Sequence, residues 1–140
     1  MEGYILLVED NPRDVEITLD LLKESGDRST VVVLDDGEQA IQYLERRGEF
    51  ENRRRDLPRV MLIDIKMPKV GGLEVLRMMK RDRELGAIPV VLLTSSRQEQ
   101  DLLAAYDLHA DGYLIKPTTP KQLAAAIETA IRAAATRNAP

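Results

Sequence analysis

The stretch Tyr4-Ile5-Leu6-Leu7-Val8-Glu9-Asp10-Asn11-Pro12 decides the fold class of this 140-residue chain. An apolar run is followed at once by two acids, as at the end of a short buried strand. Asn11 and Pro12 then favour the start of a helix, because asparagine is a good N-cap and proline fits the first helical position. A strand that passes directly into a helix predicts a βα unit.

The same arrangement recurs along the chain. Further short runs rich in Val, Ile and Leu predict buried strands at residues 30–34, 59–63, 88–93 and 112–115. The segments between them have apolar residues at helical spacing, as in Val15, Leu19 and Leu22, with Asp14 among the intervening polar residues. Alternating strands and helices predict an α/β fold, a (βα)5 doubly wound parallel sheet with helices on both faces.

Composition limits the class of protein. With 44% hydrophobic and 31% charged residues, the chain suits a single globular domain over residues 1–140, with a core from about 4 to 132 and a short tail at 133–140. The net charge of −4 argues against a nucleic-acid partner, which requires a basic face. The absence of cysteine excludes disulfides and thiol catalysis. No run is long enough for a membrane span and no signal peptide is evident, so we expect a cytoplasmic protein without a membrane partner.

Polar residues follow four of the predicted strands: Glu9 and Asp10, Asp64, Thr94 and Lys116. In an open parallel sheet, the carboxyl ends of the strands meet at the edge where ligands bind. Three neighbouring carboxylates cannot all stay ionised without a counter-cation, and Mg²⁺ is the natural partner of an oxygen-only cluster. A cation beside an exposed carboxylate can also support phosphoryl transfer. The sequence therefore predicts a divalent-cation site with phosphoryl chemistry.

The surrounding motifs are Leu6-Leu7-Val8-Glu9-Asp10-Asn11-Pro12, Leu62-Ile63-Asp64-Ile65-Lys66-Met67-Pro68, Val91-Leu92-Leu93-Thr94-Ser95 and Gly112-Tyr113-Leu114-Ile115-Lys116-Pro117. Taken together, these four motifs make the chain resemble the receiver domain of two-component response regulators over residues 4 to about 132. Details such as Ile88-Pro89-Val90-Val91 are similar to the single-domain regulators paired with bacterial phytochromes. The resemblance implies a flavodoxin-like strand order of 2-1-3-4-5.

The resemblance also implies roles for these residues. Asp64 would accept a phosphoryl group from a phosphohistidine of a sensor histidine kinase, one of the bacteriophytochrome type. The cofactor would be Mg²⁺ or Mn²⁺, held by Glu9, Asp10, Asp64 and the backbone carbonyl of Lys66. Lys116 and Thr94 would then bind the phosphoryl group.

Further positions would adjust the site. Tyr113 would change rotamer as Thr94 moves. Lys66 and Ser96 would flank the path of a hydrolytic water, and Ser95 stands where the family commonly has alanine. The loops would be shaped by Pro68, Gly72 and Pro117.

The implied function is a signalling switch, not an enzyme with a separate substrate. The chain would catalyse only its own phosphorylation and dephosphorylation, and would respond through the surface of helix four, strand five and helix five. No output domain follows the last motif, so we expect signalling by protein contact, including a homodimer. The stripe Leu123, Ile127 and Ile131 offers a dimer surface or covers the sheet.

Three other function classes fit less well. A Mg²⁺-dependent phosphatase of the haloacid dehalogenase type needs a second acid two residues after its nucleophile, but that position holds Lys66. A nucleotide-binding enzyme is disfavoured because neither glycine-rich phosphate motif is present. A constitutive interaction module would have no need of Asp10, Asp64, Thr94 and Lys116 together.

The connection from Gly48 to Pro58 is longer than the roughly 2–6 residues usual in such folds. It contains Arg53-Arg54-Arg55 and is interpreted either as a solvated surface loop or as a contact for a partner. Phe50 within it is expected to anchor the loop to the body of the domain.

Overall fold

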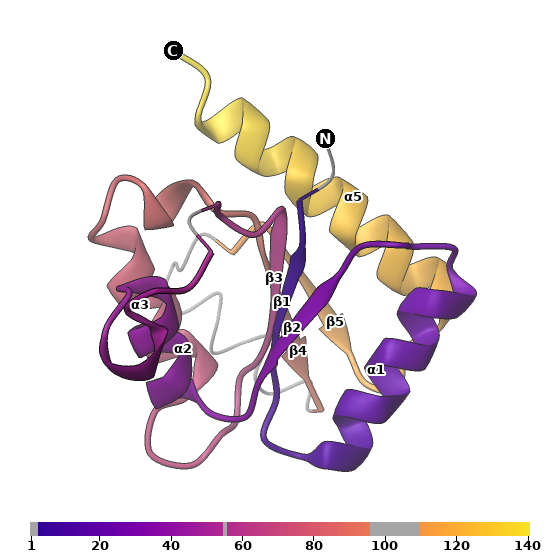
Figure 1. The fold of residues 1–140 in the computed structure, drawn as a ribbon. Coiled ribbons are helices and arrows are strands. Elements are labelled where there is room, and N and C mark those ends of the chain that lie inside the picture. The colour runs from indigo at the N-terminus through magenta and orange to yellow at the C-terminus, as the bar shows by residue number, and fades with distance from the viewer. Residues whose placement is uncertain (1–2, 55, 96–109) are drawn as a thin grey trace.

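The predicted apolar runs form the strands of one parallel sheet, in the order β2-β1-β3-β4-β5. The computed structural model describes residues 3–54, 56–95 and 110–140 (Figure 1). The strands are β1 (Ile5–Val8), β2 (Val31–Leu34), β3 (Val60–Asp64), β4 (Val90–Thr94) and β5 (Gly112–Ile115). The fold class and the strand order predicted from the sequence are confirmed.

Helices cover both faces of the sheet. They are α1 (Pro12–Glu24), α2 (Gly37–Leu44), α3 (Gly72–Lys80) and α5 (Pro120–Arg137), with short 3-10 turns at Gly48–Phe50 and Leu85–Ala87. Helices α1 and α5 pack on one face, and α2 and α3 pack on the other (Figure 1). The expected helix four lies in residues 96–109, outside the described residues. None of the described helices combines the length and the hydropathy that crossing a bilayer would require.

Alternate residues of each central strand face opposite helical layers. Leu6 and Met61 pack toward α2 and α3, whereas Ile5 and Leu62 pack toward α1 and α5. All four side chains are fully buried. A strand covered on both faces has to be apolar throughout, which is why these runs read as continuous rather than alternating. The polar residues that follow the strands are consequently the first ones able to meet solvent at the carboxyl edge.

The predicted start of α1 is confirmed in detail. Asn11 has an extended backbone, and its side-chain oxygen accepts hydrogen bonds from the backbone N–H groups of Arg13 and Asp14. Pro12 occupies the first helical position. Because this cap follows β1 with so short a link, the first turn of α1 lies at the carboxyl edge of the sheet.

Helix α5 uses its apolar stripe internally. Leu123 and Ile127 are buried against the sheet, so these two side chains cover the sheet and are not a surface for a second copy. The helix continues past residue 132 to Arg137, whose guanidinium donates to both carboxylate oxygens of Asp111 at 2.9 Å. That ion pair ties the end of α5 to the residue before β5, in place of a loose tail.

The 48–58 connection is anchored to its own chain. The rings of Phe50 and Tyr43 meet edge-on with centroids 5.4 Å apart, and the Arg53 guanidinium lies 4.3 Å from the Tyr43 centroid. The Tyr43 hydroxyl donates to the Tyr4 hydroxyl at 2.8 Å, and the Arg54 guanidinium lies over the Tyr4 ring. The expected anchoring role of Phe50 is confirmed. The solvated-loop interpretation fits the exposed Glu51, Asn52, Arg54 and Asp56, whereas Arg53 is partly covered.

Candidate functional site

Three carboxylates meet at the carboxyl edge of the sheet. The register pairs Val8 of β1 with Ile63 of β3, which places the residues after them, Glu9 and Asp64, at the same level. Glu9 and Asp64 are buried, whereas Asp10 is exposed. Each of the three offers an oxygen within 4.8 Å of the others. The sequence-predicted acidic cluster is therefore assembled by the pairing of β1 with β3.

Lys116 brings a positive charge to this cluster from the end of β5. Its Nζ lies 2.8 Å from Glu9 Oε1 and 3.3 Å from Asp64 Oδ2. Its backbone N–H donates to the Thr94 carbonyl at 2.7 Å, which holds the end of β5 beside the end of β4. The Lys116–Pro117 peptide bond that follows is cis. A single ammonium thus contacts both buried carboxylates.

Burial controls the electrostatics of the three contacting groups. It raises the pKa of Glu9 to about 7, helped by the charge of Asp64 and opposed by the hydrogen bond from Lys116. Burial also raises the pKa of Asp64 above its usual range, against the attraction of Lys116. Burial alone would lower the pKa of Lys116, but its carboxylate partners hold that pKa above its ordinary value. Without a further cation, the cluster is short of positive charge.

The donor set fits a hard divalent cation. All three clustered side chains offer carboxylate oxygens, the ligands that Mg²⁺ and Mn²⁺ prefer. The exposed Asp10 leaves the cluster open on one side, so that water or a phosphate oxygen can complete an octahedral shell. Glu9, Asp10 and Asp64 could accordingly hold such an ion together.

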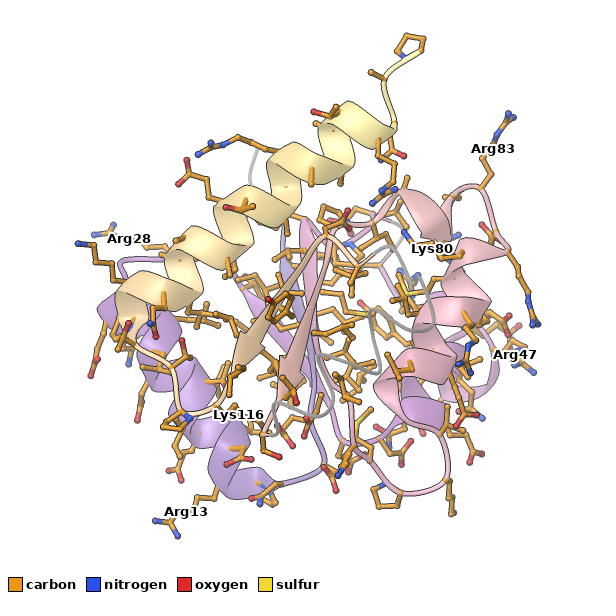
Figure 2. All side chains as sticks on the ribbon, turned by 180° about the vertical axis from the view of Figure 1, so that it is seen from behind. Arg13, Arg28, Arg47, Lys80, Arg83 and Lys116 are labelled. Atoms are coloured by element: carbon orange, nitrogen blue, oxygen red, sulfur yellow. The ribbon has the colours of Figure 1, made fainter. Side chains whose placement is uncertain are left out.

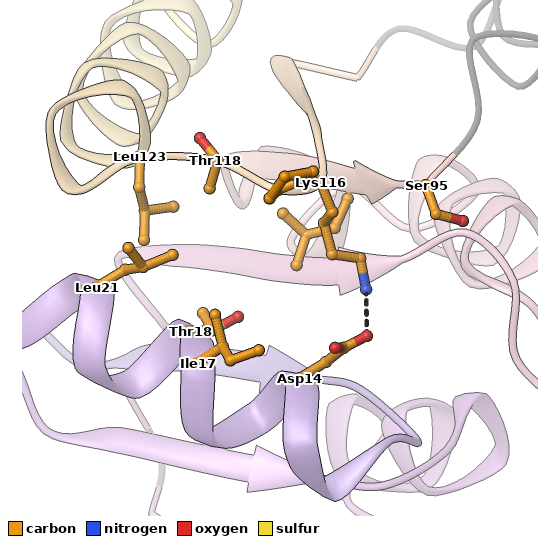
Figure 3. Close-up of a pocket in the computed structure, with 10 residues that line it drawn as sticks. Asp14, Ile17, Thr18, Leu21, Ser95, Lys116, Thr118 and Leu123 are labelled. Atoms are coloured by element: carbon orange, nitrogen blue, oxygen red, sulfur yellow. Dashed lines mark hydrogen bonds and ion pairs between the residues drawn. The ribbon is translucent and has the colours of Figure 1, made fainter.

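Asp14 is a contact of this site that the sequence reasoning missed. Its Oδ2 accepts a hydrogen bond from Lys116 Nζ at 3.0 Å (Figure 3). The helical pattern had placed Asp14 among the outward polar residues of α1, yet its side chain is only 32% exposed. Its position in the first helical turn, just after the acid pair, is the one signal that the sequence held.

The structure also describes four further residues that the sequence analysis named. Thr94 ends β4 and is fully buried. Tyr113, in β5, is turned outward and 52% exposed. Lys66 is exposed in the loop two residues after Asp64, and Ser95 is exposed directly after Thr94. Ser96 lies outside the described residues.

The loop that follows Asp64 depends on close backbone packing. Gly72 begins α3, and a Cβ built on it would lie 2.4 Å from the Asp64 carbonyl oxygen. The N–H of Gly72 donates to the Ile65 carbonyl at 2.9 Å, and the exposed Pro68 accepts from the Val70 N–H at 2.8 Å. The predicted structural importance of Gly72 thus has a direct steric cause.

A mostly apolar cavity of about 310 Å³ adjoins the site between α1 and the start of α5 (Figure 3). Leu21, Leu93 and Leu123 line its inner part, and Ile17, which is 48% exposed, lies on its α1 side. Lys116 stands beside this cavity, and Figure 2 shows its side chain at the carboxyl edge, close to α1. Asp14 and Lys116, the two residues of this ion pair, both line the cavity.

The family model described as the response regulator receiver domain matches residues 5–128. The chain belongs to this family. Among its receiver-domain relatives, response regulator Rcp1 from Synechocystis is 41% identical over 119 residues, which cover 85% of this chain and 80% of Rcp1.

Solved receiver structures agree with this placement. The bacteriophytochrome response regulator RtBRR matches with a TM-score of 0.87 and 46% identity, over 93% of this chain and 78% of RtBRR. The phosphorylated cyanobacterial phytochrome response regulator RcpA matches with a TM-score of 0.75 and 38% identity, over 91% and 90% of the two chains. The Mn²⁺-bound form of Rcp1 matches with a TM-score of 0.73 and 37% identity, over 95% and 92%.

This receiver domain is accordingly a phosphorelay signalling protein. Its fold matches that of the solved receiver structures, and its own acidic cluster offers the carboxylate oxygens that a divalent cation prefers.

Proposed function

We propose that Asp64 accepts the phosphoryl group, delivered by a phosphohistidine of a sensor histidine kinase. The observation that carries this proposal is the Lys116 ammonium, which lies 2.8 Å from Glu9 and 3.3 Å from Asp64 at the acidic edge. An acceptor carboxylate must meet an anionic phosphoryl group, so positive charge has to be in place before the reaction. A buried, lysine-paired carboxylate beside a cation site meets that requirement.

In the transfer step, an Asp64 oxygen attacks phosphorus in line with the phosphorus–nitrogen bond of the donor. The new oxygen–phosphorus bond forms as the old bond breaks, and the electron pair stays on the imidazole nitrogen. A ring protonated on its other nitrogen leaves as neutral imidazole, and an unprotonated ring takes up a proton as it leaves. Lys116 then pairs with a phosphoryl oxygen as a mobile point charge. The hydroxyl of the buried Thr94, at the end of β4, would donate to another oxygen.

Glu9, Asp10, Asp64 and the backbone carbonyl of Lys66 would hold the Mg²⁺ or Mn²⁺ ion. When bound, this ion would neutralise charge on the transferring phosphoryl group. The side chain of Lys66, exposed two residues after the acceptor, would adjust how fast water removes the phosphoryl group, and Ser95 would modulate the site as well. The domain would catalyse only these two reactions of its own carboxylate.

The partner would be a kinase of the bacteriophytochrome type, and the output would be a protein contact. Similarity to RtBRR and RcpA supports that choice of partner. Tyr113, half exposed on β5, supports a responsive surface made with α5 and the segment 96–109. Because Leu123 and Ile127 are buried in the domain, pairing with a second copy would have to use other residues of this surface.

Incubation with acetyl phosphate and MgCl2, followed by intact mass and elution volume, tests the acceptor assignment. The wild-type domain should gain one phosphoryl mass, Asp64→Asn should gain none, and the matched control Asp20→Asn, at an exposed acid of α1, should behave as wild type. Earlier elution of the phosphorylated form would support the dimer. Phosphorylation of Asp64→Asn to the wild-type extent would overturn the assignment.

The choice of kinase has a separate test. Radiolabelled phosphate should transfer to the wild-type domain within seconds from an autophosphorylated bacteriophytochrome kinase, and more slowly from an unrelated sensor kinase at equal concentration. Equal rates from both kinases would contradict the proposed partner while leaving Asp64 as the acceptor.

A further inference from the structure

Among the described residues of the site, the Asp14 side chain contacts the Lys116 ammonium. Its Oδ2 lies 3.0 Å from Lys116 Nζ, and it is not a member of the cation-binding cluster that the described acids form. It comes from the first turn of α1, whereas Glu9 follows β1 and Asp64 ends β3. The ammonium is thus held by three carboxylates from three elements, and Asp14 is the one that neither reacts nor sits in the cation cluster.

The three contacts are unequal. Lys116 Nζ lies 2.8 Å from Glu9, 3.0 Å from Asp14 and 3.3 Å from Asp64, so the contact with the acceptor is the longest. An ammonium has three donors on a flexible stem, and it moves toward whichever carboxylates remain when one is removed. Removing the Asp14 charge would therefore let Lys116 pair more closely with Glu9 and Asp64.

We infer that Asp14 is a positioning residue for phosphoryl transfer, which draws the Lys116 ammonium toward α1 and so leaves oxygens of Asp64 and Glu9 available to the divalent cation. This inference rests on the proposed function of Asp64. Lys116 competes with the cation for the same carboxylates, and Asp14 limits that competition through its own hydrogen bond. The adjoining cavity gives the lysine stem room for both positions.

The shared ammonium also has a consequence for the phosphorylated state. When the Lys116 ammonium moves to pair with a phosphoryl oxygen, its hydrogen bond to Asp14 can lengthen without disturbing the cation cluster. Asp14 would thus hold the ammonium on the α1 side of the site before transfer and release it afterwards. Asp14 both holds and releases the ammonium through Lys116. Its role can therefore be separated from a direct effect of the Asp14 charge on the cation by removing Lys116.

Calorimetric Mg²⁺ binding to the whole chain, with the metal alone as the probe, tests this role in a double-mutant cycle. Asp14→Asn should raise the Mg²⁺ dissociation constant about threefold to tenfold in the wild-type background and by less than about twofold in a Lys116→Ala background. Asp20→Asn removes the same charge from an exposed position on α1 and should leave the constant unchanged. Thermal melting in EDTA checks that each variant is folded.

Each result decides the inference. A change that needs Lys116 supports it. An equal change in both backgrounds, no change on Asp14→Asn, or the same change on Asp20→Asn overturns it. Phosphorylation by acetyl phosphate distinguishes a failure of this inference from a failure of the proposed function. If the wild-type domain gains no phosphoryl mass, the assignment of Asp64 as acceptor fails. If it is phosphorylated but the cycle shows no coupling between Asp14 and Lys116, only the role of Asp14 is removed.

Discussion

Gly72 lies directly against Asp64: a Cβ on Gly72 would stand 2.4 Å from the Asp64 carbonyl oxygen. The start of α3 is therefore packed on the backbone of the proposed acceptor. The three nearest atoms to such a Cβ all belong to the backbone of Asp64 and Ile65, so no flexible side chain could move aside to make room for it.

Gly72→Ala should damage the domain despite the better helix propensity of alanine, which is worth about 1 kcal/mol. The overlap with the Asp64 backbone should outweigh that gain and cost about 1–3 kcal/mol of unfolding free energy. The displaced loop should also slow phosphorylation by acetyl phosphate several-fold. Urea unfolding and intact mass against time measure the two effects.

Gly112→Ala is the matched control, because a Cβ there would meet its nearest neighbours at an ordinary 3.7 Å. It should melt and react nearly as wild type. Equal stability of the two variants would mean that the contact with Asp64 gives way without cost.

Phe50→Ala should lower stability without affecting the chemistry. The ring packs edge-on against Tyr43, and its loss should cost about 2 kcal/mol, less than the roughly 3–5 of a fully buried phenylalanine. The anchor reaches Tyr4, just before β1, whereas the acidic edge follows the other end of that strand. Phosphorylation well below Tm should therefore keep its wild-type rate. Glu49→Ala, at an exposed neighbour, should leave Tm unchanged, and a slowed phosphorylation of Phe50→Ala would show that the anchor communicates with the site.

The stabilisation by Mg²⁺ should grow with pH. In the metal-free domain, burial raises the pKa of Glu9 from 4.5 to about 7. Folding therefore favours protonated Glu9, and this contribution to stability is complete below pH 4.5 and is lost as the pH rises through about 7. A cation needs the ionised carboxylate, so protons compete with Mg²⁺ below pH 7.

Thermal melting with and without MgCl2 tests this competition between protons and Mg²⁺. The Mg²⁺-induced rise in Tm should be larger at pH 8 than at pH 6. In EDTA, Tm of wild type should fall from pH 6 to pH 8 relative to Glu9→Gln, which carries no titrating group at that position. A Mg²⁺ effect of equal size at both pH values would contradict the raised pKa.

The sequence by itself determined the order of the elements and the residues at the carboxyl edge. The continuous apolar runs of β1, β3 and β4 predicted strands buried on both faces, and Asn11-Pro12 fixed the start of α1 through local capping geometry. Parallel pairing then had to bring Glu9, Asp10, Asp64 and Lys116 to one edge, since each follows or ends its strand. These features follow from local chemistry and from the direction of the strands.

Only the tertiary structure decided which partner each polar side chain takes. Asp14 could have pointed to solvent, but α1 packs beside α5 on the same face of the sheet, and Asp14 accepts a hydrogen bond from Lys116. Arg53 could have been solvated, but its guanidinium packs over the Tyr43 ring, while Arg54 stays exposed above the Tyr4 ring. The stripe on α5 could have met a second copy, but Leu123 and Ile127 face the sheet. Each of these contacts joins separate segments of the chain, and periodicity along one element cannot specify what another element places opposite it.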